Sequence, residues 1–206
     1  MTTELRHQSV QSFLDQLASA TPTPGGGSVA ALTGALAAGL VSMVCSLTVG
    51  RPRYAAFDSE AQAILAQTEA LRARLTDLIQ TDIAAYTTVA AAYKRAKDDP
   101  ERAAAIAAAM VTATEIPLQI AEAAAALLPL ALPVAQHGNR TAVGDVVAGA
   151  QLAVATVHAA LINVDANIGL LADHTQRDTF LARQQAARAD IETLRDEIVA
   201  VAQGRL

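Results

Sequence analysis

The chain has 206 residues, a formal net charge of −5, a single cysteine and only 3% aromatic residues. Its negative charge argues against a general nucleic-acid binder, because such proteins carry a basic face, and the lone Cys45 excludes an internal disulfide framework. Small helix-forming residues are abundant, so we predict an all-α, single-domain bundle of about six or seven helices over residues 1–206, with no β-sheet.

The first predicted helix runs from Leu5 to Ala18. Its apolar side chains recur at helical spacing and share one face, which is formed by Val10, Phe13, Leu14 and Leu17. We expect this helix to lie across the bundle or against a partner chain. The stretch from Met1 to Ser12 is polar and lacks the apolar segment of a secretory signal, which indicates a cytoplasmic protein.

The central feature of the sequence is the stretch TPTPGGGSVAALTGALAAGLVSMVCSLTVGRPRY, from Thr21 to Tyr54. Two prolines hold its start extended, because proline fixes φ and discourages helix in the residue before it. Three glycines follow, and glycine allows the backbone to approach a ligand or another chain closely. Ser28 is a good N-cap, so we predict a helix from Ser28 to Val49 whose first N–H groups could receive an anion.

The predicted helix from Ser28 to Val49 carries no formal charge and is long enough to span a bilayer. It consists mostly of small residues and lacks an aromatic belt, which favours a buried central helix over a membrane span. Gly34, Ala38 and Ser42 recur every four residues, a spacing that suits close helix contacts in a membrane or in a soluble core. Cys45 lies in this run, so we expect it to be a buried structural residue.

Two further helices are predicted in the middle of the chain. Asp58 is a candidate N-cap for a long helix from Ser59 to Ala96. The string Asp98-Asp99-Pro100-Glu101 offers a cap, a proline at the first helical position and an acid in the first turn. It predicts the start of the next helix, which should end near Leu127.

Prolines and a glycine are expected to shape the segment after residue 110. Pro117 should bend its helix, because proline removes one backbone hydrogen bond and clashes with the preceding turn. Pro129 and Pro133 should divide the following segment into short pieces. At His137-Gly138-Asn139 we expect a helix end with Gly138 in the left-handed conformation.

The last third of the chain predicts two more helices. A long apolar one should run from Thr141 to Leu171. Asp173 or Thr175 should cap the last helix, which carries charge on most of its surface and ends near Gly204. The sequence shows no strand alternation, internal repeat or linker, which is typical of one helical domain.

Few polar residues interrupt the apolar helices, so those few are candidates for chemistry. Valine and glycine flank Asp145, and a carboxylate in apolar surroundings is either paired or raised in pKa, as a general acid or base near neutral pH requires. Alternatively, Asp145 is an acid that the helix dipole stabilises near a helix start. Glu115 precedes the expected bend at Pro117, where a kinked helix marks a pocket; an exposed acid is the alternative.

Asn163 and Asn167 are four residues apart and share a helix face. Buried amides need hydrogen-bond partners, which a substrate or a neighbouring helix could supply. Asp145 and Asn163 are eighteen residues apart, or about 27 Å along an unbroken helix. Either the helix breaks, or the two serve different ends of a ligand, or one contacts a second subunit. We therefore expect a homo-oligomer with a shared site, with a dimer favoured.

The string PTPGGGSVAAL, the small-residue helix after it and LTVGRPRY at its end together resemble the formiminotransferase-cyclodeaminase C-terminal domain family. That family includes stand-alone methenyltetrahydrofolate cyclohydrolases and cyclodeaminases. The resemblance extends over about Leu5 to Leu171. It includes ATEIPL around Glu115, the GN…D pattern of Gly138-Asn139 and Asp145, and the NVxxN pattern of the two asparagines.

The resemblance implies a site for a one-carbon tetrahydrofolate. It places Asp82 and Tyr86, one helical turn apart, at that site, although a solvated helix face is the alternative reading. Arg51 and Arg53 would hold the glutamate tail of the substrate as charge-assisted forks, or else cap a helix C-terminus as solvated charges. The remaining substrate-binding residues that it implies are Gly25, Gly26, Gly27, Ser28, Glu115, Asn139, Asn163 and Asn167.

Two related reactions follow from the resemblance, and both pass through a tetrahedral carbon between two nitrogens. Each needs a proton acceptor and a proton donor, so Asp82 and Asp145 are the catalytic candidates. We expect no metal or redox cofactor, and the four histidines show no metal-ligand spacing. Asp165 departs from the more basic or apolar residues that the family has between its asparagines, and it could weaken binding of an anionic tail.

The favoured function is hydrolysis of 5,10-methenyltetrahydrofolate to 10-formyltetrahydrofolate. The first alternative is a formiminotetrahydrofolate cyclodeaminase, which closes the ring and releases ammonia. A non-catalytic folate-binding or helical interaction protein is a second alternative, and a small membrane protein built on the stretch from Ser28 to Val49 is a third. With the favoured function we expect a folate as the small-molecule partner, and neither nucleic acid nor membrane.

Overall fold

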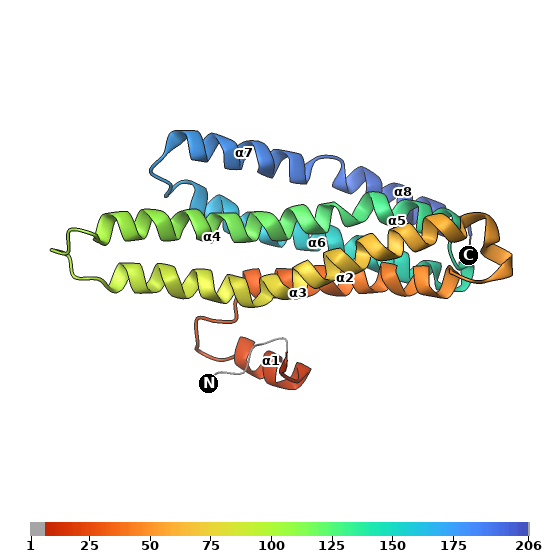
Figure 1. Cartoon of the computed structure of the whole chain (residues 1–206), viewed down its shortest axis with the longest axis horizontal. Helices are drawn as coiled ribbons and strands as arrows, with labels where there is room; N and C mark the ends of the chain where they lie inside the picture. Colours follow the sequence, from red (N-terminus) through yellow and green to blue (C-terminus); the bar gives the residue numbers. More distant parts are fainter. Residues whose placement is uncertain (1–6, 206) are drawn as a thin grey trace.

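The structure is a computed structural model that describes residues 7–205. Across these residues the prediction of an all-α fold without strands is confirmed, with eight α-helices and two short 3-10 helices (Figure 1). In chain order they are α1 (Val10–Leu17), α2 (Gly26–Thr48), η2 (Pro52–Phe57), α3 (Asp58–Lys94), α4 (Arg102–Ala125), α5 (Leu127–His137), η3 (Arg140–Ala142), α6 (Val143–Ile168), α7 (His174–Arg188) and α8 (Ile191–Gln203).

Helix α2 packs mainly against α3 and α6, so the predicted burial is confirmed for that side of the helix, while Leu36, Met43 and Leu47 on its other side are exposed. Small side chains let the helices approach: a Cβ on Gly149 of α6 would lie 3.1 Å from the carbonyl oxygen of Ala37. Close backbone contact of this kind needs alanine and glycine at the interface, and Ala37 and Ala38 are fully buried. Cys45 is also buried, and burial raises the pKa of its thiol to about 11, as expected for a structural cysteine.

The start of α2 differs from the prediction, which made Ser28 the N-cap. The helix begins at Gly26, and its N-cap Gly25 offers no side-chain hydrogen bond. Ser28 lies inside the first turn and is fully buried. Its hydroxyl is occupied by a neighbouring helix, because it donates to the carboxylate of Asp82 on α3 at 2.8 Å. A serine before an apolar run therefore served a tertiary contact here rather than a cap.

The prolines after α4 do not divide the chain as predicted. Helix α5 is continuous over Leu127–His137 and contains both Pro129 and Pro133. Pro129 lies in the first turn, where its missing N–H would be unpaired in any case, so only Pro133 removes a hydrogen bond. Helix α4 likewise continues through Pro117. Burial of the apolar face of these helices outweighs the cost of one lost bond in each.

Several predicted helix ends are also corrected. Gly138 has φ −70° and is not left-handed; glycine is required there because a Cβ would lie 2.6 Å from the Val134 carbonyl oxygen. Asp58 is the first residue of α3 rather than its cap, and its carboxylate accepts from the Gly50 N–H at 2.6 Å. Pro100 precedes α4, which begins at Arg102.

Helices at both ends of the chain also differ from the prediction. The single last helix is wrong, because α7 and α8 are separate helices joined at Asp190, whose φ is +57°. Asp173 does cap α7, as one of the two alternatives predicted. At the other end α1 begins at Val10; the predicted start at Leu5 lies outside the described residues. Helix α1 sits apart from the bundle, next to α2 and α3 (Figure 1).

Three helical stretches of residues 7–205 are long and apolar enough, by length and composition, to cross a membrane: Gly26–Thr48, Arg102–His137 and Arg140–Ile168. In the bundle, at least half of the apolar window in each of them is buried against other helices. The sequence alone had singled out only the first of the three. Much of their apolar surface is therefore satisfied by contacts within the protein.

Candidate active site

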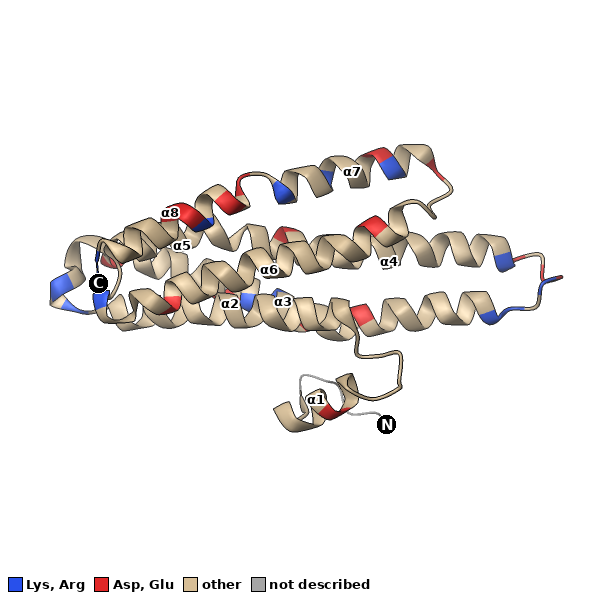
Figure 2. Ribbon diagram, turned by 180° about the vertical axis from the view of Figure 1, so that it is seen from behind, with Lys and Arg blue, Asp and Glu red and all other residues tan. Residues whose placement is uncertain are grey.

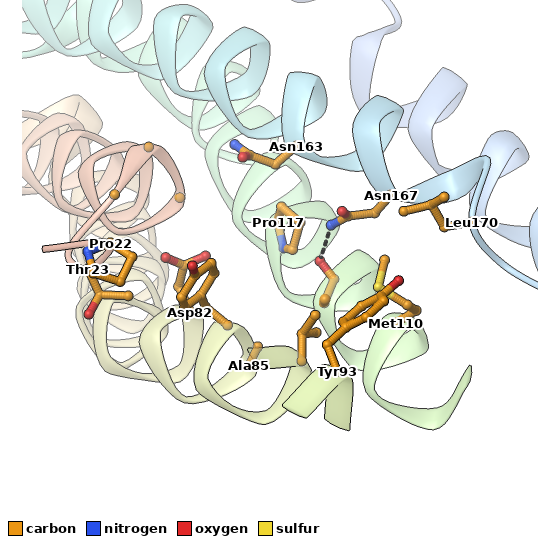
Figure 3. Close-up of a pocket in the computed structure, with 16 residues that line it drawn as sticks. Pro22, Thr23, Asp82, Ala85, Tyr93, Met110, Pro117, Asn163, Asn167 and Leu170 are labelled. Carbon is orange, nitrogen blue, oxygen red and sulfur yellow. Dashed lines mark hydrogen bonds between the residues drawn. The ribbon is translucent and has the colours of Figure 1, made fainter. Parts of the chain in front are cut away.

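A cavity of about 410 Å³ lies where the start of α2 meets α3, α4 and the end of α6 (Figure 3). This volume falls within the range of small-molecule sites in proteins. The cavity combines one carboxylate, two amides and two phenols with an otherwise apolar wall. It is lined by Pro22, Thr23, Gly25, Gly26, Gly27, Asp82, Ala85, Tyr86, Val89, Tyr93, Met110, Ala113, Pro117, Asn163, Asn167 and Leu170.

Asp82 is held in the cavity wall by the first turn of α2. Its Oδ2 accepts from the Ser28 hydroxyl at 2.8 Å, and the backbone of α2 passes close to its other oxygen. A Cβ added to Gly27 would lie only 2.1 Å from Asp82 Oδ1. Of the three consecutive glycines, Gly27 is thus the one that sterics require, whereas at Gly25 and Gly26 a Cβ would make ordinary contacts of 3.6 and 3.9 Å.

The environment of Asp82 raises its pKa above the usual value of 3.8. Burial is the largest cause, because it disfavours the charged form. Hydrogen bonds from the hydroxyl and the backbone of Ser28 act in the opposite direction but do not cancel the effect of burial. The raised pKa brings this carboxylate closer to the range in which a general acid or base works at neutral pH.

The two asparagines face Asp82 across the cavity from α6 (Figure 3). Asn167 Nδ2 donates to the carbonyl oxygen of Ala113 at 2.8 Å. That carbonyl would normally accept from the N–H four residues later in its helix, but residue 117 is a proline and has none. Asn163 Nδ2 donates to the Ala159 carbonyl at 3.0 Å. These bonds fix the orientation of both amides, and each side chain still offers its Oδ1 and a second N–H to a ligand.

Tyr86 and Tyr93 stand on the α3 side of the cavity, with Met110 and Leu170 on the opposite walls. Both phenols are about half exposed, so a flat ring could pack against them. The sequence prediction included Tyr86 but missed Tyr93. The signal was present, because seven residues are about two helical turns and place both rings on one face.

Three residues predicted to bind substrate lie at the other end of α2. Arg51 and Arg53 follow its C-terminus and are exposed, about 35 Å along the helix axis from Gly26. Asn139 connects two helix ends, since its Nδ2 donates to the Leu47 carbonyl at 3.1 Å and its backbone N–H to Thr48 Oγ1 at 2.9 Å. Asn139 therefore lies outside this cavity of its own chain, and its part in substrate binding stays a prediction.

Asp145 also lies outside the cavity. It occupies the first turn of α6, and Asn163 follows it on the same unbroken helix, so the distance of about 27 Å along the axis holds. Of the three explanations considered for that distance, a break in the helix is excluded. Asp82 and Asp145 of one chain cannot act on the same carbon, and the acid of the cavity is Asp82.

Glu115 points away from the cavity, toward α7, where it forms part of a charge cluster. Arg183 donates to Glu115 at 2.6 and 2.9 Å and to Glu122 at 2.8 and 3.0 Å. The bond to Arg183 is the main reason why the pKa of Glu115 lies below its usual 4.5. The predicted role of Glu115 in substrate binding is thus replaced by a role in attaching α7.

We predict that Glu115→Gln lowers the stability of the fold by about 1 kcal/mol, since the pair is about one third exposed and partly screened. Its contribution is present above the usual pKa of 4.5 and is lost as the pH falls through the depressed value. Urea unfolding of both proteins should therefore show a difference at pH 7 that shrinks below pH 4.5. Turnover should stay within about twofold, because the side chain does not touch the cavity; a large loss would contradict this assignment.

No group of three or more histidine, cysteine or acidic side chains that could hold a metal occurs in the part of the chain that the structure describes. The cavity offers one half-buried carboxylate, two amides, two phenols and a helix start without a side-chain cap.

Comparison with known proteins places the chain in a family. The model of the formiminotransferase-cyclodeaminase family matches residues 9–186. A methenyltetrahydrofolate cyclohydrolase from Methylorubrum extorquens is 36% identical over 93% of this chain and 94% of its own length. The formimidoyltransferase-cyclodeaminase of Sus scrofa is 34% identical over 87% of this chain, which spans only 33% of the pig protein.

A solved structure agrees with the sequence comparison. The formiminotetrahydrofolate cyclodeaminase of Thermotoga maritima superposes with a TM-score of 0.90 over 98% of both chains, at 27% identity. Both the family match and the full-length relative cover nearly the whole chain. The chain therefore belongs to the formiminotransferase-cyclodeaminase family.

Proposed function

We propose that the protein hydrolyses 5,10-methenyltetrahydrofolate to 10-formyltetrahydrofolate. The observation that carries the proposal is the half-buried Asp82, raised in pKa and opposite the acceptors of Asn163 and Asn167 in a cavity of about 410 Å³. The M. extorquens relative, which this chain matches from end to end, is named for that activity. The proposal thus rests on the site first and on the relative second.

In this reaction one carboxylate first accepts a proton from water and later donates it to a nitrogen of the substrate. Water adds to the methenyl carbon between the two nitrogens, and Asp82 takes a proton from it as the carbon–oxygen bond forms. The bond from this carbon to N5 then breaks, Asp82 returns a proton to N5, and the remaining hydroxyl proton leaves as the formyl C=O forms on N10. Substrate cation and water give product and one proton, so no electrons are exchanged and we propose no redox cofactor.

The other residues of the cavity bind and orient the substrate. Tyr86 and Tyr93 offer a face for the flat pterin ring, and the Oδ1 atoms of Asn163 and Asn167 accept from its N–H groups. The first N–H groups of α2 lack a side-chain cap and can receive a polar group of the substrate. These contacts hold the reacting carbon close to the carboxylate.

The second candidate is the cyclodeaminase reaction, which the name of the T. maritima structure favours. There N10 attacks the formimino carbon on N5, and ammonia leaves after it gains a proton. The same carboxylate would serve both proton transfers. A non-catalytic folate-binding protein is the remaining alternative, and only an assay separates the three.

The test follows the absorbance of 5,10-methenyltetrahydrofolate mixed with the purified protein. We expect the methenyl chromophore to disappear faster than in buffer. If it does not, the protein is offered 5-formiminotetrahydrofolate, and appearance of the chromophore would establish the cyclodeaminase instead. Failure of both reactions would leave binding without turnover, which titration with the folate would detect.

We also propose that the protein is a cytoplasmic homodimer with no membrane or nucleic-acid partner. Apolar surface exposed on α2 supports the dimer, and the burial of the three long apolar helices against one another supports a protein outside the membrane. Cell fractionation tests the location, because a membrane protein would require detergent. Size-exclusion chromatography with light scattering tests the subunit number.

A further inference from the structure

The side of α2 that its neighbours leave uncovered carries a continuous row of large apolar side chains. Leu36, Met43 and Leu47 are 56%, 40% and 38% exposed, and between them lie the half-buried Leu40 and Gly39 in a groove that Arg72 of α3 and Leu152 of α6 border. No charged residue occurs in Gly26–Thr48. Such a row on the surface of a soluble protein marks an interface.

Counted from its midpoint, this row has the same spacing toward both ends of the helix. Leu32 and Leu47 lie equally far from the midpoint between Gly39 and Leu40, and so do Leu36 and Met43. A two-fold interface must be self-complementary, because residue i of one subunit contacts residue j of the other and the reverse. A row with mirrored spacing meets this requirement when two copies of α2 cross antiparallel at Gly39, where the missing side chain allows close approach.

The two ends of α2 differ in charge. Beyond its C-terminus lie the exposed Arg51 and Arg53, with Arg140 and Arg205 of the same end nearby (Figure 2). Burial, and then the charges of Arg140 and Arg53, lower the pKa of Arg205, whereas Tyr54 acts in the opposite direction. The other end of α2 holds the cavity with its carboxylate Asp82.

The register of such a pair follows from the helix rise of about 1.5 Å per residue. Gly26, at the mouth of the cavity, lies about 20 Å from the midpoint, and Thr48 lies about 13 Å from it on the other side. Arg51 and Arg53 follow Thr48 within five residues. In an antiparallel pair they reach the level of Gly26 in the other copy.

We propose that two copies of this chain pair through α2, antiparallel about the midpoint between Gly39 and Leu40. Arg51 of the partner subunit and Arg53 of the partner subunit then complete the cavity beside Gly26. Given the proposed folate reaction, they bind the carboxylates of the substrate's glutamate tail as charge-assisted forks. This arrangement accounts for the 35 Å or so between these arginines and the cavity within one chain.

Apolar residues next to the row enlarge the interface. Val10 and Leu14 on α1 are 77% and 51% exposed and border the groove that Leu32 shares with α1. Ile162 on α6, next to Asn163 of the cavity, is 66% exposed. Helix α1 is anchored on its own bundle by the buried Phe13, while its exposed Val10 and Leu14 remain available to a second subunit.

Disulfide trapping tests the register without reference to folate. Leu36→Cys and Met43→Cys chains, each with a different tag, are expressed together and oxidised. Cys45 stays in place as an unreactive background, since it is buried and its pKa is about 11. We expect the two chains to cross-link to each other and neither to cross-link to itself, because only the mirrored positions approach within about 7 Å.

A third variant, Leu40→Cys, lies at the axis and should cross-link to its own copy. Both substitutions of the mixed experiment lie at exposed positions, so folding is checked by circular dichroism rather than assumed. A parallel pair would instead join Leu36→Cys chains to themselves. That result, a monomer in solution, or a protein that only detergent extracts would overturn the proposal.

Mixed dimers test whether the arginines act across the interface. One chain carries Asp82→Asn and the other carries Arg51→Ala with Arg53→Ala, and the substrate is the triglutamate form at a concentration below KM. If the site is shared, each mixed dimer has one site with both defects and one intact site. About half of the dimers are mixed, and one of the two sites in each mixed dimer is intact. About a quarter of the wild-type activity should therefore return.

The opposite result is equally clear. If the arginines served their own chain, every site of the mixed dimer would carry a defect, and activity would not exceed the sum of the two variants. Mixed dimers should recover activity on the triglutamate substrate. If the variant with Arg51→Ala and Arg53→Ala also keeps most of its activity on a folate without the tail, the arginines bind the tail. If the wild type converts neither folate, the proposed function fails, while the cross-links still decide the interface.

Discussion

Asp82→Asn should lower kcat/KM by about 100- to 10,000-fold, which is the range for loss of a general acid–base group. The amide keeps an oxygen that can accept from the Ser28 hydroxyl at the 2.8 Å contact, so the cavity should keep its shape. It cannot exchange the proton that both candidate reactions require. The measurement is the initial rate of methenyl loss at several substrate concentrations, which separates kcat from KM.

The same variant should be as stable as the wild type or more stable at neutral pH. The folded state pays for ionising Asp82, because its pKa is raised mainly by burial. That cost first appears above the usual value of 3.8 and levels off once the pH passes the raised pKa. The stability advantage of asparagine should therefore grow with pH over this window and vanish below it.

The matched control is Asp145→Asn, the other carboxylate that the sequence suggested. Asp145 lies outside the cavity in the first turn of α6, so its loss should change kcat/KM by less than about twofold. The assignment of Asp82 would be refuted if it tolerated the change while Asp145 did not. Equal loss in both would instead point to a site assembled from two subunits.

The helical fold could be predicted because its signals are local. The small, uncharged residues of the predicted helix from Ser28 to Val49 indicated a helix packed against its neighbours, and Asp173, which caps α7, was one of the two caps that the sequence offered. The errors occurred where a side chain had two possible partners. Ser28 caps helices in many proteins, but here the hydroxyl lies 2.8 Å from Asp82, 54 residues away in sequence. Such a contact depends on how α2 and α3 pack, which periodicity does not encode.

The site was predictable only in part for the same reason. Asp82, Tyr86, Asn163, Asn167 and the glycines were found through the resemblance to a family, and the structure brings them to one cavity. Tyr93 was missed although it shares the helix face of Tyr86. Glu115 was misplaced because its partner, Arg183, is 68 residues away.

Pro117 has a consequence for the cavity that the sequence alone does not reveal. Pro117 lines the cavity, and its missing N–H leaves one backbone carbonyl of α4 without its helical donor. The carbonyl of Ala113 that it leaves unpaired accepts from Asn167 at 2.8 Å. A sequence shows that a carbonyl will lack its helical donor, yet only the fold shows which side chain replaces it.

Gly27→Ala should lower kcat/KM about 100-fold and stability by about 1–3 kcal/mol. Alanine in a helix normally stabilises it by about 1 kcal/mol relative to glycine. Here, however, the new Cβ would lie 2.1 Å from Asp82 Oδ1 and 2.6 Å from its Cγ. The carboxylate must therefore move away from Ser28. It would then no longer lie beside the substrate carbon that reacts.

The expected loss of stability at Gly27 is opposite in sign to the usual effect of replacing glycine by alanine in a helix. Gly144→Ala in α6 is the control, because a Cβ there meets nothing within 4 Å, and it should stabilise the fold without affecting turnover. A double-mutant cycle then isolates the cause: once Asp82→Ala has removed the obstructing carboxylate, Gly27→Ala should become neutral or stabilising in thermal unfolding. If Gly27→Ala destabilised both backgrounds equally, the close approach of α2 to Asp82 would not be the reason for glycine at this position. If it did so only where Asp82 is present, the first turn of α2 and the catalytic carboxylate form one unit, and the glycine sets where the proton is exchanged.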